Sequence, residues 1–134
     1  MAEQSFKIYI VEPDPLFIKV LERTLMEISD VVKANIICFT DGEAFLNRYA
    51  HQDEYAIYII NDILPKQSGT TLISEIRRHD EKGIIYIMSK SNTSRALEFA
   101  IGLGADNFFI KPFNLDVFKA VITRKIERRS FAWN

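Results

Sequence analysis

The sequence is poor in residues that cross-link a chain, break its regular structure or give it a net charge. Cys38 is the only cysteine among 134 residues, so no disulfide can form within the chain, and a reducing cytoplasm is the expected compartment. The 17 basic and 18 acidic residues give a net charge of −1, which is no reason to expect nucleic-acid or membrane binding. No apolar run approaches the ~20 residues of a membrane span. The first residues also lack the basic start and apolar stretch of a signal peptide.

Five short apolar runs alternate with five longer amphipathic stretches. The runs are rich in isoleucine, valine and aromatic residues, and several are apolar almost throughout, as expected for strands buried on both faces. They cover residues 6–11, 34–39, 55–60, 84–88 and 107–110.

The amphipathic stretches predict helices. The first spans residues 15–29 and the last spans 115–128, with Asp14 and Asn114 placed to cap their starts. Three shorter helices follow the second, third and fourth apolar runs.

Strict alternation of strands and helices predicts parallel pairing with right-handed crossovers. We therefore expect a single α/β domain over residues 1–128. Its sheet should be doubly wound and flavodoxin-like, with five parallel strands in the order 2-1-3-4-5 and five flanking helices. Residues 129–134 form a tail that suits the start of a linker to an effector domain, or equally a true terminus.

Polar residues follow four of the five strands. In a doubly wound sheet, the functional crevice lies outside the carboxyl ends of the strands where the winding reverses. The residues that the chain order places there are Glu12, Pro13, Asn61, Asp62, Ser89 and Lys111.

Over essentially its whole length the chain resembles the CheY-like receiver domains of bacterial response regulators. The resemblance rests on the Ile-Val-acid opening at 10–12, the Lys-Pro-Phe run at 111–113 and the spacing of Pro65 and Gly69. In that family the phosphate-accepting aspartate lies four residues before the proline and eight before the glycine. Both counts lead here to Asn61, so the resemblance implies an atypical, degenerate member that lacks the acceptor.

Two further departures concern the metal site. Receiver domains usually open with two adjacent acids, of which the second binds Mg²⁺, and here these positions read Glu12 and Pro13. An amide at Asn61 is no nucleophile and carries no charge. A hard cation that needs oxygen ligands has therefore lost two carboxylates, and we expect neither a metal nor another cofactor.

Three residues match the family pattern more closely. Ser89 stands where receiver domains have a hydroxyl that contacts a phosphoryl oxygen. Lys111 stands where they have the cation that pairs with the acceptor aspartate. Without the usual carboxylates, we expect Lys111 to pair with Glu12, with Asn61 or with both. Phe108 occupies the switch aromatic position and lacks the hydroxyl that a tyrosine would carry.

The leading functional prediction is a receiver domain in two-component signal transduction that is not an enzyme and works without phosphorylation. It would act through protein partners, including a second copy bound at the fourth helix, the last strand and the last helix. Input from a histidine kinase is not expected, nor is nucleic-acid or membrane binding by this domain. Transcription regulation follows if a DNA-binding domain succeeds the tail.

The alternative prediction is a conventional phospho-acceptor that uses Asp62 with Mg²⁺. Neighbouring residues of a strand point to opposite faces, so Asp62 is expected to face away from the crevice. Strand ends relax that rule, however, and a bulge could also restore its aim. A third reading, a small-ligand binder such as a flavin protein on this fold, is disfavoured. The loop at 12–15 carries acids and prolines instead of the N–H donors that bind phosphate.

Overall fold

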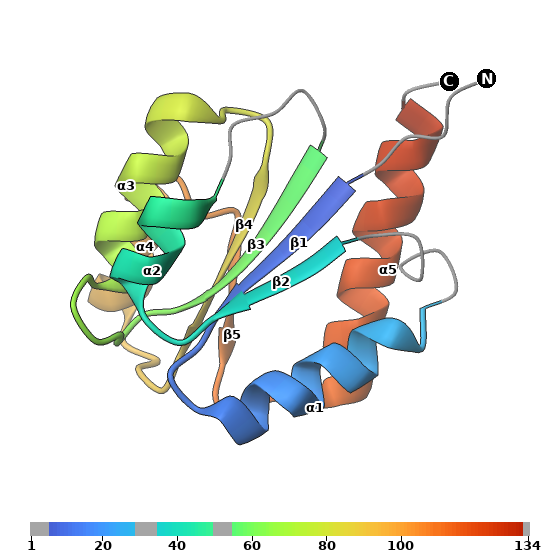
Figure 1. Cartoon of the computed structure of the whole chain (residues 1–134), viewed down its shortest axis with the longest axis horizontal. Helices are drawn as coiled ribbons and strands as arrows, with labels where there is room; N and C mark the ends of the chain where they lie inside the picture. Colours follow the sequence, from blue (N-terminus) through green and yellow to red (C-terminus); the bar gives the residue numbers. More distant parts are fainter. Residues whose placement is uncertain (1–5, 29–34, 50–54, 133–134) are drawn as a thin grey trace.

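The computed structural model describes residues 6–28, 35–49 and 55–132. Within those ranges five strands alternate with five helices (Figure 1). The strands are β1 Phe6–Val11, β2 Asn35–Phe39, β3 Tyr55–Asn61, β4 Ile84–Ser89 and β5 Asn107–Ile110. The helices are α1 Pro15–Met26, α2 Gly42–Arg48, α3 Gly69–His79, α4 Ser94–Leu103 and α5 Leu115–Ala132.

The strands form one parallel sheet in the order β2-β1-β3-β4-β5, which confirms the predicted doubly wound, flavodoxin-like architecture. α1 and α5 cover one face of this sheet, and α2, α3 and α4 cover the other (Figure 1). Side chains of β1 alternate between the two cores. Ile8 and Ile10 pack with residues of α1 and α5, whereas Tyr9 and Val11 pack with residues of α2 and α3.

The predicted end of the first helix is too late. α1 ends at Met26, because the N–H groups of Glu27 and Ile28 bond to carbonyl oxygens three residues back and tighten the last turn. Ile28 is nevertheless buried, as its place in the apolar stripe predicted. The expected end of this helix at residue 29 and the expected start of the second strand at residue 34 lie outside the described residues.

Side-chain caps begin the first and last helices. Asp14 Oδ1 accepts a hydrogen bond from the N–H of Leu16 at 2.9 Å, and Asn114 Oδ1 accepts one from the N–H of Val117 at 3.0 Å. Both predicted caps are therefore confirmed. α5 continues to Ala132, so its helical backbone extends beyond the predicted domain boundary.

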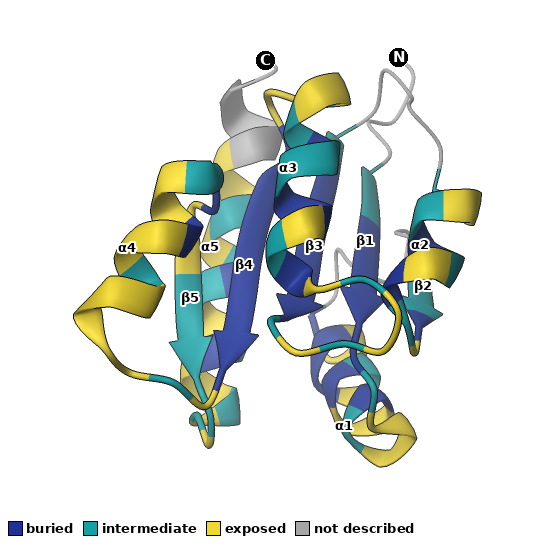
Figure 2. Cartoon of the chain, turned by 90° about the vertical axis from the view of Figure 1, so that its left-hand side faces the viewer, coloured by how far each residue is buried: buried dark blue, intermediate teal, exposed yellow. Residues whose placement is uncertain are grey.

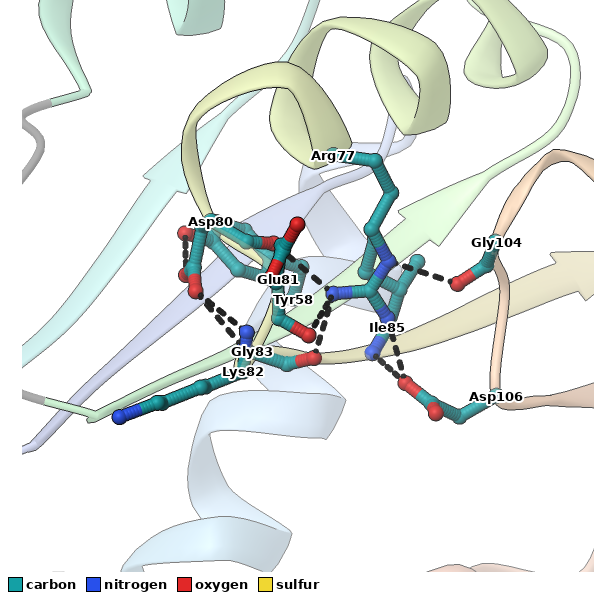
Figure 3. A network of polar contacts seen from close by, with 9 residues as sticks. All are labelled: Tyr58, Arg77, Asp80, Glu81, Lys82, Gly83, Ile85, Gly104 and Asp106. Carbon is teal, nitrogen blue, oxygen red and sulfur yellow. Dashed lines mark hydrogen bonds and ion pairs between the residues drawn. The ribbon is translucent and has the colours of Figure 1, made fainter.

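A network centred on Arg77 holds the edge of the sheet at which the strands begin (Figure 3). Its guanidinium donates to the carbonyl oxygens of Gly83 at 2.8 Å and Gly104 at 2.9 Å, and to Asp106 Oδ2 at 2.9 Å. Asp106 Oδ2 also accepts from the N–H of Ile85 at 2.8 Å. One side chain of α3 thus joins the loops that precede β4 and β5.

Replacing Arg77 by methionine is expected to lower the free energy of unfolding by about 2–4 kcal/mol, because partly buried acceptors lose their donors. Urea unfolding followed by circular dichroism measures this loss. Arg78→Met is the matched control, since Arg78 lies on the same helix with a 70% exposed side chain paired to Glu75. That variant should lose less than about 1 kcal/mol. Equal losses in the two variants would contradict the role given to Arg77.

Candidate functional site

A crevice lies where the carboxyl ends of β1, β3, β4 and β5 converge. Its volume is about 1020 Å³, and the residues that line it come from the loops after these strands and from the starts of α1 and α5. Among them are five of the predicted site residues, namely Glu12, Pro13, Asn61, Asp62 and Lys111. The parallel sheet has therefore brought together groups that are far apart in the sequence.

A buried ion pair joins the ends of β1 and β5. Lys111 Nζ donates to Glu12 Oε1 at 2.7 Å, which is one of the pairings expected from the sequence. The side chains of Glu12 and Lys111 are only 2% and 16% exposed. Glu12 Oε2 accepts a second hydrogen bond, from the N–H of Asp14 at 3.0 Å. Both carboxylate oxygens are thus satisfied, as a buried charge requires.

An aromatic ring holds the same lysine from another side. Lys111 Nζ lies 4.8 Å from the centroid of the Phe17 ring, a cation–π distance. The Phe17 ring in turn meets Phe113 edge to face, with centroids 5.8 Å apart. Lys111 is therefore bound to the end of β1 and the start of α1.

Asn61 is buried and its side chain serves the loop that follows β3. The residue is 8% exposed, and its Nδ2 donates to the carbonyl oxygen of Ile63 at 2.7 Å. The neutral amide offers Lys111 no charge to pair with, and the hydrogen bond of Lys111 goes to Glu12.

Asp62 does not face away from the crevice, so the exception expected for a strand end applies. Its side chain turns toward β4, and Ser89 Oγ donates to Asp62 Oδ2 at 2.7 Å. The reason is local: β3 ends at Asn61, so the strand alternation no longer applies one residue later. The N–H of Ile63 also donates to Asp62 Oδ1 at 2.8 Å and fixes the carboxylate at the crevice.

The presence of glycine at position 69 has a steric cause. The N–H of Gly69 donates to the carbonyl oxygen of Asp62 at 2.9 Å, so the start of α3 lies against the end of β3. A Cβ at Gly69 would lie 2.5 Å from the carbonyl oxygen of Asn61, closer than real Cβ atoms come. Pro65 lies in the same loop, and its carbonyl oxygen accepts from the N–H of Gly42 at 3.3 Å.

The two remaining predicted site residues, Ser89 and Phe108, lie on β4 and β5. Ser89 is buried, and its Oγ accepts from the N–H of Ser91 at 2.9 Å while it donates to Asp62. Phe108 is half-buried and packs against the core on the side of α2 and α3.

The oxygen atoms of this crevice do not fit a magnesium site. Mg²⁺ requires near-octahedral oxygen ligands, often from carboxylates. Here both oxygens of Glu12 are occupied by Lys111 and a backbone N–H, while each oxygen of Asp62 accepts a hydrogen bond. Across the described ranges, no group of three or more His, Cys, Asp or Glu residues is placed to hold a metal ion.

Among the crevice residues that sequence reasoning missed are Phe17, Ile63 and Lys90. Phe17 lies in the amphipathic stretch that predicts the first helix, and an apolar residue there is expected to pack against the sheet. Its position in the first turn after Glu12 was the signal that it lies near the strand ends. Ile63 is 76% exposed, and its place directly after Asp62 was the corresponding signal.

Fold and crevice together define a doubly wound α/β protein whose polar residues gather at the switch point of the sheet. Residues 8–123 match the family described as "Response regulator receiver domain". The chain therefore belongs to the receiver domains of two-component response regulators.

Relatives with this domain include transcription regulators. The chain is 28% identical over 130 residues to the probable transcriptional regulator ycf27 of Guillardia theta, covering 97% of the chain and 49% of the relative. It is 29% identical over 129 residues to the transcriptional activator protein IrlR of Burkholderia pseudomallei, covering 94% and 52%. The chain thus spans about half the length of these relatives.

Solved structures show the same fold. Response regulator DrrB, a Thermotoga maritima OmpR/PhoB homologue, has a TM-score of 0.78 at 23% identity, over 94% of this chain and 54% of that one. A two-component response regulator from Clostridium difficile has a TM-score of 0.73 at 25% identity, over 92% and 98%. Among the described helices, none is long and apolar enough to cross a membrane.

Replacing Lys111 by methionine is expected to lower the free energy of unfolding by about 3 kcal/mol, because Glu12 would stay buried without its counter-ion. The double variant Glu12→Gln/Lys111→Met should lose less than the single one, since the stranded charge is gone. Denaturant unfolding measures both.

The control for this prediction is Lys119→Met, which breaks the exposed ion pair with Glu27. It should lose less than about 1 kcal/mol. A double variant that loses the sum of its single changes would show that Glu12 and Lys111 are not coupled.

Proposed function

We propose that this receiver domain works without phosphorylation, as a regulatory and protein-interaction module of a two-component system. The observation that carries the proposal is Asn61 at the acceptor position, buried and bonded through its amide to the loop that follows. Phosphoryl transfer depends on positioning and on charge neutralisation. Here the nucleophile is absent, Pro13 replaces an acid, and Lys111 is engaged by Glu12.

The proposal extends to what the domain does and where. We assign it no catalytic residue and no cofactor, and we place its action in the cytoplasm, in keeping with a single cysteine. Its input would come from a protein partner or a ligand instead of a histidine kinase. Because relatives about twice as long are named as transcription regulators, we propose that the output of the whole protein is transcription regulation.

One observation favours a second candidate, a phospho-acceptor at Asp62. The hydrogen bond from Ser89 keeps this carboxylate at the crevice, beside the hydroxyl that the family pattern assigns to phosphate. Two observations count against it: Lys111 is engaged by Glu12, and the described residues include no group of carboxylates, histidines or cysteines placed to hold a metal ion. The two candidate functions therefore predict different results for phosphate labelling of the wild-type protein and of variants at Asn61 and Asp62.

Incubation with acetyl phosphate and Mg²⁺ is expected to leave the mass of the intact protein unchanged. The reason is that the acceptor position carries an amide, the oxygens of the crevice do not fit Mg²⁺, and Lys111 is bound to Glu12. Asn61→Asp should take up phosphate poorly, since Pro13 still denies the metal a carboxylate. Pro13→Asp/Asn61→Asp should take up more than the sum of the single variants, because the two carboxylates share one ion. Intact-protein mass spectrometry measures each.

The decisive control is Asp62→Ala. Wild-type protein that gains one phosphoryl group, and loses this gain in Asp62→Ala, would overturn the proposal and establish the second candidate.

We further propose a homodimer through α4, β5 and α5. α4 exposes Phe99 by 59% and Ile101 by 43%, and much of this helix is open to solvent (Figure 2). Two charged residues at this face are already engaged within the chain, Asp106 with Arg77 and Lys119 with Glu27. Apolar contacts of α4 therefore support the association better than charge pairs do.

Sedimentation equilibrium at high micromolar concentration is expected to show a dimer that Phe99→Asp converts to monomer, because a carboxylate would be buried at the interface. Met26→Asp is the matched control. Met26 is 62% exposed on α1, which is not one of the three elements of the proposed interface, and its replacement should leave the dimer intact. A monomeric wild-type protein would contradict the proposal.

A further inference from the structure

The crevice is largely apolar, although its family position is that of a phosphate and metal site. Its volume of about 1020 Å³ is at the upper end of the range of small-molecule pockets. Six of the lining residues are apolar: Pro13, Phe17, Ile63, Pro112, Phe113 and Leu115.

One carboxylate in this apolar setting lacks a counter-ion. Asp62 is half-buried and accepts hydrogen bonds from Ser89 and from the N–H of Ile63, but within the described residues it has no cationic partner. Lys111, the cation that the family pattern assigns to the acceptor, is bound to Glu12 instead. A carboxylate has about four acceptor sites, so two of those on Asp62 are open to a ligand.

Outside the Glu12–Lys111 pair, the other charged residues that line the crevice are solvent-exposed and therefore more strongly screened. Asp14 is exposed and caps α1, and Lys90 is exposed at the start of the loop after β4. A partly buried charge interacts more strongly than an exposed one at the same distance. Asp62 therefore decides which head group the crevice prefers.

We propose that the crevice binds a small organic cation, with an ammonium or guanidinium group at Asp62 and an aromatic or aliphatic body among the apolar residues. An anionic ligand is disfavoured by the charge of Asp62. A divalent metal is disfavoured because the other buried carboxylate of the crevice, Glu12, is engaged by Lys111 and a backbone N–H. The inference rests on the proposed function, because a phosphoryl group on Asp62 would occupy the same oxygens.

Three probes of nearly equal shape test the charge preference: 2-phenylethylamine, 2-phenylethanol and 3-phenylpropionate. Each is titrated at pH 7 into ¹⁵N-labelled wild-type protein, and amide shifts are followed without any phosphate donor. We expect the amine to bind about fivefold or more tightly than the alcohol, as charge-assisted hydrogen bonds are the stronger ones. The carboxylate should bind most weakly. Shifts should centre on Ile63, Ser91 and Leu115.

Two variants distinguish direct contact between the ammonium group and Asp62 from attraction by the overall negative charge of the crevice. Asp62→Asn should reduce the affinity for the amine to that for the alcohol, while the Asn oxygen still accepts from Ser89. Asp14→Asn removes the same charge from the rim and keeps a good helix cap, so it should change the affinity less than about twofold. Should Asp62→Asn not fold, the three-probe comparison on wild-type protein still decides the question.

Equal binding of amine and alcohol, an unchanged amine affinity in folded Asp62→Asn, or shifts centred outside the crevice would overturn the inference. Failure of the proposed function gives a different signal. Wild-type protein that incorporates phosphate at Asp62 refutes phosphorylation independence, whereas the amine titration reads the unphosphorylated protein alone.

Discussion

Parallel strand pairing is the constraint on which the rest of this structure depends. Parallel strands cannot be joined by tight turns, so each connection crosses over through a helix and both faces of the sheet are buried. All carboxyl ends consequently lie at one edge. This is why Glu12 and Lys111, 99 residues apart in sequence, meet at 2.7 Å. It also explains why β3 and β4 are buried almost along their whole lengths.

The converging strand ends bring charged side chains close together. In this chain the set of carboxylates beside Lys111 differs from the pattern of the family. With an amide at Asn61 and proline at position 13, Glu12 is the remaining buried acid, and its single positive partner is Lys111. The ring of Phe17 completes the environment of the ammonium group. This pair engages the lysine that the family pattern assigns to the phosphoryl group. Asp62, in contrast, is held by hydrogen bonds from Ser89 and from the N–H of Ile63.

Particular residues show how far sequence reasoning reached. The helix caps at Asp14 and Asn114 were predictable because capping depends on residue type and immediate neighbours. The early end of α1 was not, since the tightened last turn follows a hydrogen-bond choice that the apolar stripe does not reveal. The Arg77 network was also hidden, because its acceptors lie on loops that only the folded chain brings together (Figure 3).

The sequence by itself determined the fold class, the strand order and the absence of a nucleophile at position 61. Periodicity, alternation and residue identity are local properties that carry this information. Only the tertiary structure decided that Lys111 pairs with Glu12 while its ammonium group lies against the Phe17 ring. The same holds for the direction of Asp62, whose side chain turns toward Ser89. The physical reason is that side chains beyond a strand end are released from its alternation. Their directions are then set by hydrogen bonds to residues distant in sequence, which no local pattern encodes.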